Sequence, residues 1–442
     1  MGLALACAAL ACGSGKPDPP AGAQPSAGGA PLEPPPSAPS APPAAPPSPS
    51  AAPAEPVVAG VPLWKDIESQ QKACALRARE LEPNLFSGAI AVAAHRRELA
   101  MAWLLSTPVR GEGLVAFGSY DTMTRTVTRS HGLGKAVAAA PRLFRGHDWW
   151  TVAWFDRGGL VYARATHARQ AYEPTHVSAV AAADAEHTAI IRTSSGPLLA
   201  VAPVRPNDRA ELGLFFLDSP DPSEPPARAL GATKNANGPR HPALLEAGGG
   251  FLVAWEDTPP GGAPSLLVSH FDPKGSEDGQ RQRLPSPSAR EPSRPALALA
   301  GPNVLAAWVE TFRDVPTVFV RALDPAGAPL GPPYRVAEGT LPTLHPIEGG
   351  AALAFVSSAG VEADNVFVVG VTPSGRPAPE GYVVSEAKKN RALSHAQPAL
   401  ALGSDGRLAV VFSYSPEMRF AMKTLAAPCL LASAGAAGLP RP

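Results

Sequence analysis

A short sequence unit recurs seven times along this chain and constrains the fold that it can adopt. In each copy an apolar run leads into a turn, and a second apolar run ends 13 residues after the unit begins. The clearest copies run from Pro242 to Trp255 and from Pro295 to Trp308. The units end at Trp103, Trp154, Val201, Trp255, Trp308, Phe355 and Val411, in steps of 51, 47, 54, 53, 47 and 56 residues. Seven such units fill residues 86–429 and leave no room for another domain.

Each unit contains further runs of β-branched and aromatic residues. After Trp308 the chain continues with Thr317–Leu323, the turn Asp324-Pro325-Ala326-Gly327 and the run 334–337. The same order returns as Ser265–Phe271 followed by the turn Asp272-Pro273-Lys274-Gly275. These runs are too short, and too often interrupted by Pro, Gly and Asp, to be helices. Four strands in roughly 50 residues, repeated seven times, predict an all-β fold, a seven-bladed β-propeller of four-stranded blades.

The tryptophans of the repeat predict where the core lies. A single four-stranded sheet cannot bury both of its faces, whereas blades that pack face to face bury both. We therefore expect Trp103, Trp154, Trp255 and Trp308 to lie between blades. Trp149 and Trp150 precede the repeated position. They lie in the core, or one of them lies at the surface and stacks on a ligand; the sequence leaves both alternatives open.

The N-terminal residues 1–12 are small and apolar and end at Cys12. They resemble the end of a bacterial lipoprotein signal peptide, in which a cysteine after a Leu-small-small box receives the lipid. The resemblance implies lipidation of Cys12, with Cys7 as the weaker alternative. No basic residue precedes the apolar run, and an earlier start codon would supply one. Gly13 after the cysteine favours the outer membrane, so the expected location is the cell envelope, with a lipid as the only membrane attachment.

Residues 13–56 are almost wholly Pro, Ala, Ser and Gly. Such a segment favours polyproline II and cannot bury enough apolar surface to fold. We expect a disordered tether that separates the lipid from the propeller.

The repeat itself resembles one found in large exported proteins of myxobacteria. The matching phrases are Gly250–Asp257 and Val320–Gly327, in which a tryptophan precedes an acidic residue by two positions and a strand leads into an Asp-Pro-x-Gly turn. The resemblance covers about residues 86–425. It implies export and a propeller fold, and it implies no activity.

The segments that flank the repeats suggest how the ring closes. Residues 57–85 are expected to form a strand and a short helix, with the helix over 64–82 and Val57–Leu63 as the outermost strand of blade 7. Residues 430–442 form a C-terminal tail. Cys74 and Cys429 lie just outside the two ends of the array, which a closed propeller brings together, and an exported protein meets an oxidising compartment. A disulfide between them is predicted, and two buried thiols are the alternative.

Charge and motifs narrow the possible functions. Lys and Arg total 38, as do Asp and Glu, so the chain lacks the basic field typical of nucleic-acid binding. No apolar run is long enough to span a bilayer. The ten histidines include no close ligand pair, and no phosphate or dinucleotide fingerprint occurs. We expect no metal, no cofactor, no nucleic acid and a monomeric protein, and no catalytic residue is identified.

Seven polar residues share one predicted position in the ring. In a propeller the first strand of each blade begins, and the second ends, on the same face, which we call the entry face. Four polar residues directly precede the first strand of a blade: His187, His241, Arg294 and Gln397. Three acidic residues lie two positions after the end of a unit: Asp156, Asp257 and Glu310. All seven are therefore expected on the entry face. One interpretation is turn chemistry, with local ion pairs such as Glu310 with Arg313. The other is a polar binding site for a ligand or partner.

Two classes of function remain open. The first is a non-catalytic envelope lipoprotein whose propeller binds a protein or a glycan. The second is a propeller glycoside hydrolase or lyase that acts on polysaccharide, which needs two carboxylates about 5–9 Å apart around a sugar. The sequence favours the first class, because it offers no identifiable catalytic pair.

Overall fold

The computed structural model describes most of the repeat region and two segments before it. The described residues are 63–66, 75–81, 86–96, 98–106, 113–121, 131–137, 140–146, 149–165, 174–177, 180–204, 211–217, 228–233, 238–258, 262–285, 290–357, 364–385, 391–392, 397–415 and 419–436. The predicted signal segment with Cys7 and Cys12, the tether over residues 13–56 and Cys74 lie outside them.

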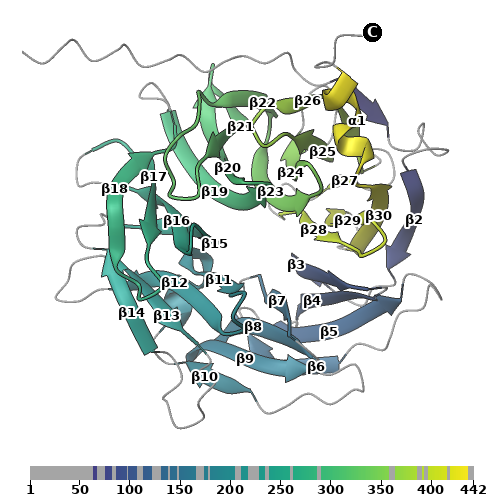
Figure 1. The fold of residues 1–442 in the computed structure, drawn as a ribbon. Helices are drawn as coiled ribbons and strands as arrows, with labels where there is room; N and C mark the ends of the chain where they lie inside the picture. Colours follow the sequence, from purple (N-terminus) through teal and green to yellow (C-terminus); the bar gives the residue numbers. More distant parts are fainter. Residues whose placement is uncertain are drawn as a thin grey trace, which may run out of the picture. The chain divides into compact units, whose positions relative to one another are not determined.

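The chain forms seven four-stranded antiparallel blades arranged as a propeller (Figure 1), and one blade carries an additional parallel strand. Blade 1 holds β3 (Phe86–His95), β4 (Glu98–Ser106), β5 (Gly113–Asp121) and β6 (His131–Ala136). Blade 2 holds β7 (Arg142–Arg145), β8 (Trp150–Asp156), β9 (Gly159–Ala165) and β10 (Thr175–Val177). Blade 3 holds β11 (Ala189–Arg192), β12 (Leu198–Val204), β13 (Glu211–Phe216) and β14 (Arg228–Thr233), and the short 3-10 helix η2 (Ala182–His187) precedes it.

The second half of the ring repeats this pattern. Blade 4 holds β15 (Arg240–Ala247), β16 (Gly250–Asp257), β17 (Ser265–Phe271) and β18 (Glu277–Arg283). Blade 5 holds β19 (Arg290–Ala300), β20 (Asn303–Phe312), β21 (Val315–Leu323) and β22 (Tyr334–Glu338). Blade 6 holds β23 (Thr340–Ile347), β24 (Gly350–Ser357), β25 (Asn365–Val371) and β26 (Pro377–Val383). In blade 7 the innermost strand is split into β27 (Arg391–Ala392) and β28 (Ala399–Leu402), followed by β29 (Arg407–Ser415) and β30 (Arg419–Ala426).

The 13-residue unit of the sequence is the pairing register of the first and second strands. In blade 1, Ile90 lies opposite Trp103, the two ends of that unit. Blades 4 and 5 keep the register, with Ala243 opposite Ala254 and Ala296 opposite Ala307. In blades 3 and 7 the pairing is displaced by one residue. The seven-bladed fold predicted from the repeat is therefore confirmed.

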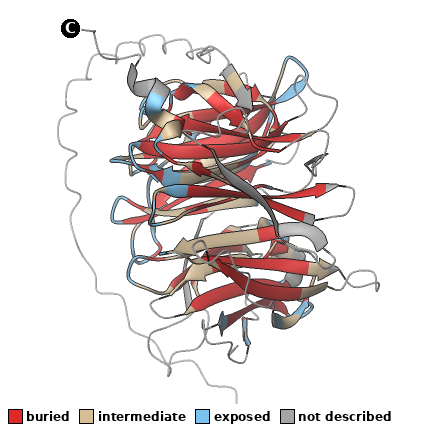
Figure 2. Cartoon of the chain, turned by 90° about the vertical axis from the view of Figure 1, so that its right-hand side faces the viewer, coloured by how far each residue is buried: buried red, intermediate tan, exposed pale blue. Residues whose placement is uncertain are grey.

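The core lies between the blades. Seven apolar clusters fill the gaps, and each joins residues of two neighbouring sheets. Trp103 lies between blades 7 and 1, Trp255 between 3 and 4, and Trp308 between 4 and 5. Trp150 and Trp154 both lie between blades 1 and 2, which removes the surface role for Trp150. Figure 2 shows the buried residues running along the middle of the strands.

Two segments before blade 1 add strands to the last two blades. β1 (Leu63–Asp66) pairs in parallel with β26 as a fifth strand of blade 6, and β2 (Ala75–Leu81) pairs with β30 as the outer strand of blade 7. The predicted helix over 64–82 is wrong for the described part of that segment, and Leu63 joins blade 6 instead of blade 7. These two segments are strands because they pair with the exposed outer edges of β26 and β30. Such long-range pairing is not visible in the local sequence.

A short helix that the sequence did not predict follows the propeller, in the segment expected to be a C-terminal tail. The described helix is α1 (Cys429–Ala436), and its Leu430 packs into the core between blades 6 and 7. No helix within the described residues is long and apolar enough to cross a bilayer.

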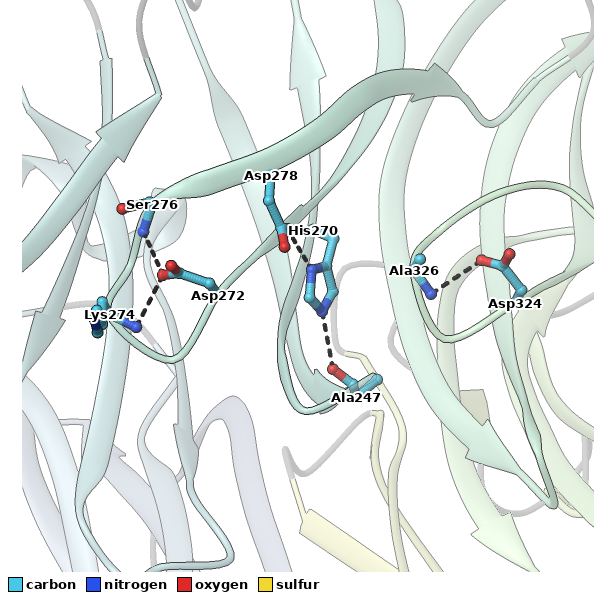
Figure 3. A network of polar contacts seen from close by, with 8 residues as sticks. All are labelled: Ala247, His270, Asp272, Lys274, Ser276, Asp278, Asp324 and Ala326. Atoms are coloured by element: carbon cyan, nitrogen blue, oxygen red, sulfur yellow. Dashed lines mark hydrogen bonds and ion pairs between the residues drawn. The ribbon is translucent and has the colours of Figure 1, made fainter.

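The Asp-Pro-x-Gly turns of the repeat connect neighbouring blades. In blade 5, Asp324 Oδ1 accepts hydrogen bonds from the backbone N–H groups of Ala326 and Ala328, at 2.9 and 2.8 Å. Gly327 adopts a left-handed φ of 91° and faces Leu252 of blade 4. Asp272 caps the equivalent turn of blade 4 in the same way (Figure 3). The motif is thus explained by turn geometry and by packing between blades.

Candidate functional site

The first strands of blades 4, 5 and 6 share an irregular start on the entry face. In each, a residue with positive φ precedes a proline: His241 at 42°, Arg294 at 53° and Leu341 at 56°. The strand register shifts at each of these positions. A bulge redirects side chains, and left-handed conformations are unfavourable for residues other than glycine. The sequence placed His241 and Arg294 at this position, and the backbone there is held in an uncommon conformation.

Four polar groups from three blades meet at this edge of the ring, and we call them the His–Glu cluster: His187, His241, Glu256 and Arg294. Nδ1 of His241 lies 2.7 Å from Oε1 of Glu256, and the backbone N–H of Arg294 donates to the same oxygen at 2.7 Å. The backbone N–H of His241 donates to Nδ1 of His187 at 3.5 Å, and the two rings meet edge to face at 4.9 Å. The cluster therefore links blades 3, 4 and 5.

The environment sets the charge of two members of the cluster. Burial lowers the pKa of His187, and the positive charges of His241 and Arg240 lower it further, against Glu186 and Asp184. Burial alone would raise the pKa of Glu256, but the hydrogen bonds from His241 and Arg294, together with their charges, hold it below its ordinary value. At neutral pH the cluster holds an ionised carboxylate beside a neutral His187 imidazole.

Glu310 is a buried carboxyl without a hydrogen-bond partner for one of its oxygens. It is 3% exposed, and within the described part of the chain its buried Oε2 has no such partner. Burial raises the pKa of Glu310 to about 7, although the adjacent Trp308 opposes the shift. The expected surface turn with an ion pair to Arg313 is wrong, because the regular β20 register turns Glu310 to the same side as the buried Trp308. Arg313 instead lies over the ring of Phe312.

Besides Glu310, three more of the seven predicted residues do not join the cluster. Asp156 caps its own turn, with Oδ1 accepting from the Gly158 N–H at 2.7 Å, and its Oδ2 lies 3.4 Å from His176 on the outer strand. Gln397 donates to the carbonyl oxygen of Pro342 and ties blade 7 to blade 6. Asp257 is buried on the same side of β16 as Trp255, which faces blade 3. The turn interpretation is right for Asp156.

The sequence-based prediction missed Glu256, although a signal was present. The residue after the end of the unit is apolar in the six other copies, as Leu104, Phe155, Ala202, Val309, Val356 and Phe412. A single acidic residue at a position that is otherwise always buried needs a partner. Comparison of the copies position by position would have singled it out.

Other polar groups of the propeller serve the fold. His270 of β17 lies 2.5 Å from Asp278 of β18 and 3.2 Å from the carbonyl oxygen of Ala247, which ties three strands of blade 4 together (Figure 3). Burial lowers the pKa of His345 to about 4, and its Nε2 accepts the N–H of Leu402 across to blade 7. Among the described residues, no three His, Cys, Asp or Glu side chains gather as a metal site.

Comparisons with known proteins agree on the fold. No protein-family model matches the chain, and no curated protein matches it in sequence. The solved structure of the polysaccharide lyase Uly1 is similar with a TM-score of 0.50 and 8% identity, over 78% of this chain and 91% of that one. An α-L-arabinanase of Penicillium chrysogenum, complexed with arabinobiose, is similar with a TM-score of 0.43 and 12% identity, over 79% of this chain and 100% of that one. A protein of unknown function from Dyadobacter fermentans gives 0.47 and 11%, over 79% and 99%. At these identities the likeness is one of propeller architecture.

Proposed function

We propose that this protein is a lipid-anchored envelope protein whose propeller binds a polysaccharide at the His–Glu cluster. The observation that carries the proposal is the meeting of two imidazoles, a carboxylate and an exposed arginine from three blades at one edge of the ring. Carboxylates, imidazoles and guanidinium groups are donors and acceptors suited to the hydroxyl groups of sugars. The alternative is that the propeller binds a protein instead of a polysaccharide.

Backbone strain supports a binding role for this edge. Of the described residues other than glycine with positive φ, His241, Glu291, Arg294, Arg313 and Asp314 all belong to the entry face of blades 4 and 5. Strained backbone of this kind concentrates at functional sites, where the surrounding structure over-determines it.

Binding is tested by isothermal titration and affinity electrophoresis with arabinan, xylan, polygalacturonate and alginate. We expect at least one of them to bind, and His241→Ala and Arg294→Gln to weaken that binding about tenfold or more, since the first removes an imidazole held by Glu256 and the second removes the exposed positive charge of the cluster. His176→Gln, which changes an exposed histidine on the rim of blade 2, is the matched control and should bind normally. Equal binding by all four proteins would place the site elsewhere, and binding of none of the polymers would contradict the proposal.

The envelope location is tested separately. Metabolic labelling with a palmitate analogue, in cells that express the chain with a complete signal, should label the wild type and not Cys12→Ser. Membrane fractions should then hold the wild type alone. Equal labelling of the two proteins would remove the lipid anchor from the proposal.

A further inference from the structure

One arginine occupies a position at which the other six blades have a small residue. Arg142 on β7 lies opposite Ala153, and Ala153 packs toward blade 3. The innermost strands lie around the middle of the ring, where neighbouring blades converge (Figure 1), so small side chains fit between them best. The residues equivalent to Arg142 on the other innermost strands are Ala91, Ala189, Ala243, Ala296, Thr343 and Ala399. The packing of the blades therefore does not account for an arginine at this position.

The side chain of Arg142 turns back toward the entry face. Its Nη1 donates to the carbonyl oxygens of Ala140 at 2.8 Å and Pro141 at 3.3 Å, the two residues that directly precede β7. Ala140 occupies in blade 2 the same position of the repeat that three members of the His–Glu cluster occupy in blades 3, 4 and 5. The guanidinium group therefore lies at the same level of the ring as the His–Glu cluster, in the blade that precedes it.

The guanidinium group of Arg142 has no counter-ion among the described residues. Burial lowers the pKa of Arg142, and no neighbouring charge opposes the shift. Its Nε and Nη2 form no hydrogen bond within the described part of the chain, and neither atom is sealed from solvent. Arg145 on the same strand and Arg192 of blade 3 differ, because their Nε atoms are sealed. Arg142 is thus a cation that protein largely surrounds, and two of its nitrogen atoms remain open to a ligand.

We propose that Arg142 binds an anionic group of the polysaccharide, the carboxylate of a uronic acid or a sulfate ester, and makes the propeller selective for an acidic polymer. This inference rests on the proposed function, since the polymer that contacts the His–Glu cluster extends along the entry face to blade 2. Nε and Nη2 are adjacent donors of one planar group, and such a pair matches two oxygens of a carboxylate or a sulfate. The bound anion also compensates a positive charge that the fold leaves unpaired.

Selectivity is measured by isothermal titration with two carboxylated polymers (polygalacturonate and alginate), sulfated carrageenan, and neutral arabinan and xylan. Fully methyl-esterified polygalacturonate is the matched neutral polymer. We expect an acidic polymer to bind about tenfold or more tightly than every neutral one, and the better of the carboxylated and sulfated polymers identifies the anionic group. Arg142→Ala introduces the residue type that five other blades carry, so it should fold. Arg142→Ala and Arg142→Gln should each weaken acidic binding about tenfold or more and make it less sensitive to salt.

The control is Arg376→Gln, which removes an exposed arginine between β25 and β26 on the opposite face of the ring and should bind as the wild type does. Circular dichroism melts establish that each variant is folded. Binding of neutral polymers as tightly as acidic ones would overturn this inference and leave the proposed binding function intact. Acidic binding that Arg142→Ala leaves unchanged would likewise overturn the role of Arg142, and binding of no polymer would overturn both proposals.

Discussion

At the scale of single residues, the gap between blades 4 and 5 places a tryptophan and a carboxyl side by side in the interior. Trp308 is fully buried and stacks near Phe319 at 6.1 Å. Glu310, two residues later on the same side of the strand, is almost as buried. Burial of Trp308 stabilises the fold. Burial of the Glu310 carboxyl is tolerated only while the carboxyl is protonated. Each has its own measurable consequence for stability.

Glu310→Gln should remove a pH dependence of stability. Burial raises the pKa of Glu310 from 4.5 to about 7. Below pH 4.5 the carboxyl is therefore protonated in both the folded and the unfolded chain, and its titration does not change the free energy of unfolding. As the pH rises from 4.5 to 7, the unfolded chain ionises first, so the free energy of unfolding falls, by about 3 kcal/mol in full. Urea melts at pH 4.5 and 7.5 should show this loss in the wild type and not in the glutamine variant. Equal losses in the two proteins would mean that Glu310 is not desolvated.

Trp308→Ala should destabilise the propeller strongly. Removal of a fully buried tryptophan leaves a cavity between blades 4 and 5, and such truncations cost about 3–5 kcal/mol. The control is Leu299→Ala in the same blade, where the leucine is 41% exposed, and its cost should be below about 1 kcal/mol. Denaturant melts of the two variants compare them directly, and similar midpoints would contradict the assignment of the core.

The polar site was only partly predictable from sequence at this scale. The repeat placed His187, His241 and Arg294 on one face, because their positions before the first strand are equivalent. The repeat singles out Glu256 as the one acidic residue at its position, but its contact with Arg294 forms across blades through a backbone N–H and is not visible in the sequence. It also misjudged Glu310, whose depth depends on the β20 register and on the packing of the neighbouring blade.

At the scale of elements, the two strands before blade 1 are where sequence and structure disagree most. β2 reads Ala-Leu-Arg-Ala-Arg-Glu-Leu, a composition that suits a helix by local propensity. Its strand conformation depends on pairing with β30, more than 300 residues later in the chain, and no local pattern contains that information. The seven repeated units, in contrast, carry their register within 13 residues, which explains why their strands were predictable.

β1 should stabilise blade 6 through a single side chain. Trp64 meets Phe367 edge to face at 4.8 Å and Phe355 at 5.8 Å, and it lies directly over Gly381, where a Cβ atom would come within 2.3 Å of its ring. Trp64 is only partly buried, so Trp64→Ala should cost about 2 kcal/mol, less than Trp308→Ala. Hydrogen exchange measured by mass spectrometry should also show faster exchange in Pro377–Val383. Unchanged exchange there would mean that β1 does not hold this edge.

At the scale of the whole molecule, the ring is closed by strands that precede it. β2 joins the last blade and the chain then enters β3 of the first blade, so blade 7 contains strands from both ends of the sequence. Closure of this kind couples the stability of blade 7 to the N-terminal segment, because removal of β2 would expose the edge of β30. The same closure brings the surroundings of the two remaining cysteines together.

We predict that a disulfide between Cys74 and Cys429 locks this closure. Ala75, the residue after Cys74, lies opposite Leu425, and Cys429 begins α1 four residues after Leu425. A bond across a loop of roughly 350 residues restricts the unfolded chain, and the chain-entropy relation sets an upper limit of about 6 kcal/mol on its contribution. Non-reducing peptide mapping of protein expressed in the periplasm should find the two cysteines in one linked pair, and reduction should lower the melting temperature.

A Cys74→Ser, Cys429→Ser variant should melt at the lower temperature whether or not reductant is present, which separates loss of the bond from other effects of the reductant. If mapping finds both thiols free, blade 7 is closed by the pairing of β2 with β30 alone, and the double variant should then melt with the wild type.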